Sequence, residues 1–153
     1  MLKACLLLSL SSCLLFGVDL PTRHVLNFTT VRALATAAEN EAAKRNVHVS
    51  ICIVDENGNL LFFERLEGAS LNTVEFAQRK ARHSAFYKSP SKNAADQVKG
   101  GNTAILAFPY AFPNQGGLPI KVGGETIGAI AVSGAASEVD EAIGQTALDS
   151  VLK

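Results

Sequence analysis

Two stretches of the chain alternate between apolar and polar residues, and each predicts a pair of β-strands. In the first, apolar side chains occupy every second position from Val47 to Ile53, which is the period of a half-buried strand. The residues from Asp55 to Gly58 favour a turn, because an aspartate side chain accepts hydrogen bonds from the turn backbone and glycine closes it. Residues 60–65 return as a second strand-like run. We therefore expect a β-hairpin over residues 47–65.

The second stretch, from Gln115 to Ala135, is rich in glycine. It holds six of the twelve glycines of the chain, and Gly123-Gly124 separates two apolar runs. Paired glycines in that place predict a tight hairpin turn, because both can adopt positive φ without a steric clash. Gly116-Gly117, just before the hairpin, has two interpretations. Its consecutive N–H groups could bind an anion, or the pair is only a flexible lead-in.

Most of the remaining chain predicts helices, because its apolar residues recur at the helical period. The expected helices run from the capping residues Asn27–Thr30 to Arg45, over residues 72–87 and 92–98, and from Ser137, with Asp140 as part of the cap. The apolar run from Thr103 to Phe108 is expected to add a strand. The order of elements then predicts an antiparallel α+β fold with helices outside and between two hairpins.

The first 18 residues predict a secretory signal peptide, and residues 19–153 predict a single domain. Lys3 supplies a positive charge, an almost unbroken apolar run follows, and Gly17 is a small residue suited to cleavage. The run is too short for a comfortable membrane span, so the expected location is periplasmic or secreted. Residues 10–13 also resemble a lipoprotein box that would acylate Cys13, although the apolar run continues past this cysteine.

Composition limits the classes of partner. Fourteen basic and fourteen acidic residues cancel, so no overall electrostatic field draws the chain to nucleic acid or to an anionic membrane. Hydrophobic residues make up 48% of the 153 residues, which is ample for the core of one domain. Cleavage of the signal peptide would leave Cys52 as the only cysteine, in an apolar run where a small buried side chain is expected.

One predicted helix carries a candidate binding face. Arg79, Arg82, His83 and Phe86 are spaced i, i+3, i+4 and i+7, so they share a face of the helix over residues 72–87. Guanidinium groups bind carboxylates and a histidine can bind a metal, so this face suits an anionic, partly apolar ligand. The alternative is a solvated basic face that pairs with acidic residues of a neighbouring subunit. No motif of a nucleophilic, zinc-dependent or nucleotide-binding site occurs in the sequence.

The chain resembles the GlcG/HbpS family over nearly all of the predicted mature domain, and it also resembles the C-terminal domain of PduO-type proteins. The order and spacing of five short segments carry the resemblance: Val54–Leu60, Arg65–Ala69, Arg79–Arg82, Gly116–Ile120 and Ile127–Ala135. The resemblance implies a profilin-like α+β domain with a five-stranded antiparallel sheet flanked by helices. It also implies homo-oligomers, as dimers or larger assemblies.

The resemblance further implies an exported haem-binding protein that buffers or senses haem or iron, with slow haem degradation and a sensor protein as a partner. His83 stands where several relatives carry threonine, and a histidine there would ligate the iron through an imidazole nitrogen. Arg79 and Arg82 would bind the haem propionates, and Phe86 would form an apolar wall.

Two further hypotheses stay open at this point. The first is a non-catalytic module that binds a small organic acid through Arg65, Lys80, Gly116 and Gly117. The second is an oligomeric accessory module whose basic face is a subunit interface.

Overall fold

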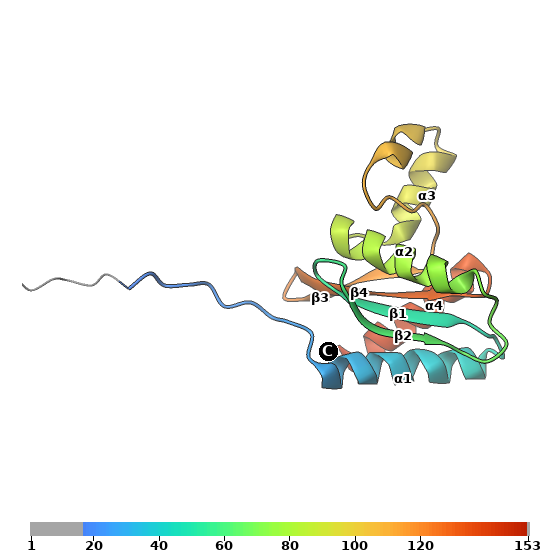
Figure 1. Cartoon of the computed structure of the whole chain (residues 1–153), viewed down its shortest axis with the longest axis horizontal. Coiled ribbons are helices and arrows are strands. Elements are labelled where there is room, and N and C mark those ends of the chain that lie inside the picture. The colour runs from blue at the N-terminus through green and yellow to red at the C-terminus, as the bar shows by residue number, and fades with distance from the viewer. Residues whose placement is uncertain (1–16, 153) are drawn as a thin grey trace, which may run out of the picture.

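The computed structural model describes residues 17–152 and shows an α+β fold (Figure 1). Its elements, in chain order, are α1 (Phe28–Lys44), β1 (Ser50–Asp55), β2 (Leu60–Arg65), α2 (Thr73–Tyr87), α3 (Ser91–Lys99), the 3₁₀ helix η1 (Thr103–Ala107), β3 (Gly117–Val122), β4 (Glu125–Ser133) and α4 (Ser137–Val151). The predicted α+β class and the four α-helices are therefore confirmed.

The sheet has four antiparallel strands in the order β2-β1-β4-β3. Its two hairpins, β1–β2 and β3–β4, are joined edge to edge through β1 and β4, whose register places Ser50 opposite Ser133. The predicted turn between β3 and β4 is present at Gly123 and Gly124, with φ angles of 57° and 84°. Two consecutive positive φ angles match the twist of a hairpin, which explains the paired glycines.

Two layers of helix cover the sheet. Helix α1 runs along one face and α2 along the other (Figure 1). Helix α4 packs beside α1, because Ile143 and Ala147 belong to the same buried cluster as Leu34 and Ala38. On the opposite face the buried cluster consists mainly of small residues: Cys52, Val54, Ala77, Ala81, Ala85, Ala129 and Ala131. Small side chains on both surfaces let α2 approach the sheet closely.

The predicted fifth strand is wrong. Thr103–Ala107 forms the 3₁₀ helix η1 instead, in a lobe with α3 that projects away from the sheet beyond α2 (Figure 1). The run is continuously apolar and does not alternate, and Pro109 directly follows Phe108, so the chain there lacks a backbone donor for a strand ladder. Ile105 is buried, whereas Leu106 and Phe108 are 55% and 57% exposed.

The N-terminal segment remains a sequence prediction. Residues 1–16, which hold most of the predicted signal peptide and Cys13, lie outside the described part of the chain, and Gly17 and Val18 are exposed. Within residues 17–152, no helix is both long enough and apolar enough to cross a membrane.

Gly116-Gly117 is a point of close contact between the glycine-rich hairpin and α2. A Cβ atom added to Gly117 would lie 2.5 Å from the Lys80 carbonyl oxygen and 2.8 Å from the Ser84 hydroxyl. A Cβ atom on Gly116 would lie 2.8 Å from the Val132 carbonyl oxygen and 2.9 Å from Lys80 Nζ. Contacts this short with backbone atoms cannot be relieved by a rotamer change. These glycines therefore let β3 lie directly against α2.

We predict that Gly117→Ala destabilises the fold by about 2 kcal/mol or more, because the added methyl group forces β3 away from α2. The free energy of unfolding in urea measures the effect. Gly100→Ala is the matched control, since a Cβ atom there would come no closer than 3.4 Å to its neighbours. Equal stability of the two variants would show that the close contact is not required.

Candidate ligand pocket

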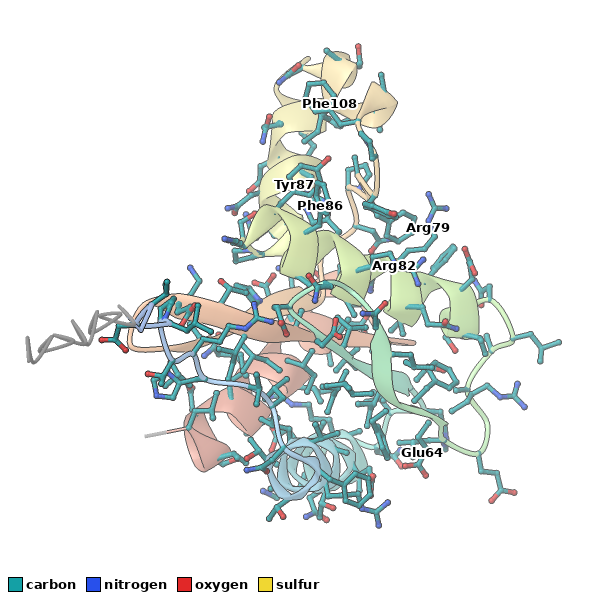
Figure 2. All side chains as sticks on the ribbon, turned by 60° about the vertical axis from the view of Figure 1, so that its left-hand side comes forward. Glu64, Arg79, Arg82, Phe86, Tyr87 and Phe108 are labelled. Atoms are coloured by element: carbon teal, nitrogen blue, oxygen red, sulfur yellow. The ribbon has the colours of Figure 1, made fainter. Side chains whose placement is uncertain are left out.

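Helix α2 has an inner and an outer face, and the candidate residues divide between them. Lys80, His83 and Ser84 are buried, whereas Phe86 is 52% exposed and the Arg79 side chain is half exposed. Figure 2 shows Arg79 and Arg82 side by side on the same side of α2, with Phe86 further along the helix and Phe108 on the projecting lobe. The structure thus brings together Arg79, Arg82 and Phe86, as the helical spacing predicts. The prediction that His83 belongs to the same exposed face is wrong, because its side chain is buried.

A pocket of about 320 Å³ lies between the outer face of α2 and the chain that follows η1. Its lining residues are Glu75, Arg79, Arg82, Leu106, Phe108, Tyr110 and Ala111. The volume lies at the lower end of the range for small-molecule sites. The pocket combines guanidinium groups with an aromatic wall.

Aromatic contacts hold both guanidinium groups in place. The Arg79 Cζ atom lies 4.3 Å from the centre of the Phe112 ring, and the Arg82 Cζ atom lies 5.9 Å from that of Tyr110. Arg82 Nε also donates a hydrogen bond of 3.4 Å to the Gly58 carbonyl oxygen in the β1–β2 turn. A guanidinium group has five N–H donors, so donors remain on each arginine for an anionic ligand.

The pocket opens onto an exposed apolar patch. Phe86, Leu106, Phe108 and Tyr110 are each more than half exposed, and the rings of Phe86 and Tyr110 lie 5.1 Å apart, centre to centre. Large apolar residues gathered beside a pocket are typical of a binding surface. Helical spacing in the sequence singles out Phe86 alone among these four, because the others lie outside the predicted helices.

His83 faces the loop before β3 and does not line the pocket. Its Nδ1 atom accepts a hydrogen bond of 3.1 Å from the Phe112 backbone N–H, and its ring lies 4.7 Å from that of Tyr87. The Tyr87 hydroxyl in turn donates a hydrogen bond of 2.7 Å to the Pro109 carbonyl oxygen. His83 and Tyr87 therefore hold the loop onto α2. Iron ligation by His83 stays a prediction, and it would require Nδ1 to release Phe112 or the other ring nitrogen to become accessible.

Burial lowers the pKa of His83, and a hydrogen bond with the Tyr110 backbone partly opposes this effect. The lowered pKa favours the neutral ring, in which Nδ1 can accept the hydrogen bond from the Phe112 N–H.

Lys80 lies on the inner face of α2, where it forms a buried ion pair with Asp140 of α4. Lys80 Nζ donates to Asp140 Oδ2 at 2.9 Å and to the Val132 carbonyl oxygen at 3.1 Å, and both side chains are almost fully buried. Asp140 Oδ1 accepts a further hydrogen bond from the Ala135 N–H. Burial lowers the pKa of Lys80 and raises that of Asp140, and the attraction between the two charges opposes both shifts.

The predicted cap of the last helix, Ser137 with Asp140, is wrong. Its N-cap is Ala136, with no side-chain hydrogen bond, and Asp140 serves instead as the partner of Lys80 and of the Ala135 N–H. A carboxylate in the first turn of a helix is an ordinary feature in sequence. Only the tertiary structure reveals that this one is paired with Lys80.

The other predicted binding residues lie apart from the pocket. Gly116 packs against Lys80, and the Gly117 N–H donates to the Ser91 hydroxyl at 2.9 Å, so close packing accounts for this glycine pair. Arg65 Nη1 donates to the Ala69 carbonyl oxygen at 3.3 Å, at the end of β2. Lys80 instead lines a second, more polar pocket of about 240 Å³, together with Asp140, Ser133 and Ser137.

Cys52 is fully buried beneath α2, and burial raises the pKa of its thiol to about 12. Its predicted burial is thus confirmed. Among residues 17–152, no three His, Cys, Asp or Glu side chains are grouped so that they could hold a metal ion by themselves.

The family described as "Haem degrading protein HbpS-like" matches residues 26–149 of the sequence. The chain belongs to the HbpS-like family. The match covers every helix and strand of the fold apart from the last residues of α4. The resemblance to the GlcG/HbpS family is therefore confirmed.

Similar proteins support the same assignment. Protein GlcG of Escherichia coli K12 is 33% identical over 112 residues, which cover 73% of this chain and 84% of that protein. The crystal structure of HbpS has a TM-score of 0.80 and 30% identity, and the match covers 90% of this chain and 97% of that chain. The structure of a PduOC:heme complex has a TM-score of 0.79 and 27% identity, and covers 84% and 96% of the two chains.

We predict that Lys80→Met destabilises this HbpS-like domain by about 3–5 kcal/mol, because it leaves the Asp140 carboxylate buried without a partner. Adding Asp140→Asn should recover part of the loss, since asparagine removes the charge and keeps an acceptor for the Ala135 N–H. Unfolding in urea measures both effects. Lys92→Met is the control, because its ion pair with Asp96 lies on the exposed surface of α3. Similar stabilities of Lys80→Met and the wild type would contradict the structural role of the pair.

We also predict a pH dependence that originates at His83. Its pKa is lowered in the folded state, whereas an unfolded histidine titrates near 6.5, so the unfolded chain binds more protons as the pH falls below about 6.5. Stability is therefore full above about pH 6.5 and is lost as the pH falls towards the folded pKa. His83→Gln should flatten the change in unfolding free energy between pH 7 and pH 5, because glutamine accepts a hydrogen bond without titrating. His24→Gln, in the exposed leader, should leave the profile of the wild type unchanged, and identical profiles for all three proteins would refute the assignment.

Proposed function

We propose that this protein binds haem in the pocket between α2 and the loop before β3. The observation that carries the proposal is the position of Arg79 and Arg82 beside an exposed aromatic surface, at the opening of one pocket. Haem has a flat apolar ring system with two carboxylates on one edge. The two arginines suit the carboxylates, and the aromatic surface suits the ring system. The solved complex of PduOC with heme, a structural neighbour of this chain, supports the proposal.

The pocket residues divide the recognition between them. Arg79 and Arg82 would hold the propionates through charge-assisted hydrogen bonds, which are stronger than neutral ones. Phe108 in the pocket, and Phe86 beside Tyr110 at its edge, would pack against the apolar ring. Glu75 also lines the pocket and lies 4.0 Å from Arg79, so its negative charge opposes the binding of an anion. Bound haem would supply the iron for any redox chemistry, including the haem degradation for which the family is described.

Three further properties belong to this proposal. Export to the periplasm or to the medium is supported by the signal-peptide pattern of residues 1–18. A homo-oligomer is supported by the family resemblance and by the exposure of three large apolar side chains, Phe86, Leu106 and Phe108, since exposed apolar groups of this kind often mark interaction surfaces. Three further roles rest on the family resemblance alone. They are the buffering or sensing of haem, the interaction with a sensor protein, and slow haem degradation.

We predict that hemin titration of the purified chain produces a saturable Soret absorbance band. The double variant Arg79→Gln/Arg82→Gln should bind hemin roughly a hundredfold more weakly, since each tenfold change corresponds to about 1.4 kcal/mol and each of the two lost charged hydrogen bonds contributes about that much. Lys121→Gln is the control, because it removes an exposed cation on β3 that does not line the pocket. The proposal fails if the wild type gives no band at equimolar hemin, or if the double variant and the control bind equally well.

The polar pocket beside Lys80 and Asp140 favours a second candidate function, the binding of a small organic acid. Its lining is mainly hydroxyl groups, amide side chains and the Lys80–Asp140 ion pair, which suit a small carboxylate better than the apolar ring of a porphyrin. This candidate requires a carboxylic acid to raise the melting temperature by mass action, both in the wild type and in Arg79→Gln/Arg82→Gln. A shift that the double variant abolishes would assign the acid to the haem pocket instead.

A further inference from the structure

Tyr110 has an unusual backbone conformation, with a φ of 59°. Two other non-glycine residues of the described chain, Asn46 and Lys88, also have positive φ, and both lie at the ends of helices, where a left-handed residue is an ordinary stop. Tyr110 is instead the third residue of a turn that starts at Phe108, whose carbonyl oxygen accepts from the Ala111 N–H at 3.2 Å. Glycine or asparagine adopts this position more readily than tyrosine.

The turn aims the Tyr110 side chain at the proposed haem pocket. Tyr110 is one of the pocket-lining residues and is 54% exposed, so its hydroxyl can reach a ligand. The chain is anchored on both sides of it, by the Tyr87 hydroxyl at Pro109 and by the His83 ring at Phe112. A bulky residue that is held in a disfavoured conformation by its surroundings points to a functional constraint.

Few groups at this pocket can ligate iron. Of its seven lining residues, only Glu75 and Tyr110 carry an oxygen of a ligating type in the side chain, and Glu75 is the ion-pair partner of Arg79. His83 does not line the pocket, and its Nδ1 atom is occupied by the Phe112 N–H. Tyrosine is an established class of haem ligand.

We infer that the Tyr110 hydroxyl is the protein ligand to the iron of the bound haem, an inference that rests on the proposed haem-binding function. On binding, an oxygen–iron bond forms and the phenolic proton leaves to solvent, so that the ligand is a phenolate. His83 then acts on the haem indirectly, as the residue that positions the loop carrying Tyr110.

Resonance Raman spectroscopy of the ferric hemin complex tests this assignment, because iron-bound phenolate gives its own vibrations and a charge-transfer absorption. The wild type should show both, and Tyr110→Phe should lose both while its hemin affinity falls by roughly tenfold. His83→Gln, which keeps an acceptor for Phe112, should retain the phenolate signals. Far-UV circular dichroism checks that each variant is folded.

The possible outcomes separate this inference from the proposed function. A wild-type complex that forms but lacks phenolate signals overturns the role of Tyr110 and leaves haem binding intact. Persistence of the signals in Tyr110→Phe, or their loss in His83→Gln alone, also overturns it. A wild type that binds no hemin at all rejects haem binding and the ligand together.

Discussion

The buried ion pair between Lys80 and Asp140 is the interaction on which the arrangement of this domain depends. It joins α2 to α4 across the end of β4, because Lys80 also donates to the Val132 carbonyl oxygen and Asp140 accepts from the Ala135 N–H. Burial disfavours both charges, as the lowered pKa of Lys80 and the raised pKa of Asp140 indicate. Such a pair contributes little net stability over an apolar substitute, and its better-attested use is to specify one arrangement. Here it fixes the rotation of α2 about its own axis.

That rotation determines what α2 presents to solvent. With Lys80 directed inward, Arg79 and Arg82 must lie on the outer side, where Tyr110 and Phe112 of the loop pack against them. The two glycines that approach Lys80 set the path of the chain into β3, and thus where the preceding loop begins. Hydrogen bonds with His83 and Tyr87 of α2 hold this loop against the helix. The shape of the pocket therefore depends on the orientation of α2 against the sheet, which is set by residues that do not line the pocket, such as Lys80, Gly116 and Gly117.

Local sequence patterns predicted the parts of the fold that local forces determine. Paired glycines at Gly123 and Gly124 and the alternation from Val47 to Ile53 predicted both hairpins, because a turn needs positive φ and a strand has a period of two. The run from Thr103 to Phe108 was mistaken for a strand, since hydrophobicity does not show whether a short apolar run has a partner strand. That segment packs with α3 outside the sheet.

The sequence predicted only the part of the candidate site that the local helical period determines. Helical spacing brought Arg79, Arg82 and Phe86 together correctly. It could not show that a loop covers His83, or that Asp140 pairs with Lys80 across 60 positions of sequence. Tyr110 carries no motif, and its place directly after Pro109 is the only feature of the sequence that favours a turn there. Its positive φ and its place in the pocket are properties of the folded chain alone.

The claim that the outer face of α2 and its loop form the haem site is tested most directly by mapping the ligand on the backbone. Amide resonances of the isotopically labelled chain can be followed by NMR during titration with gallium protoporphyrin IX, a diamagnetic analogue of haem. The account predicts that shift changes concentrate on Arg79, Arg82, Phe86 and residues 106–112, while Ser133 and Ser137 beside the polar pocket stay unchanged. Changes centred on the polar pocket, or none near residues 106–112, would contradict it.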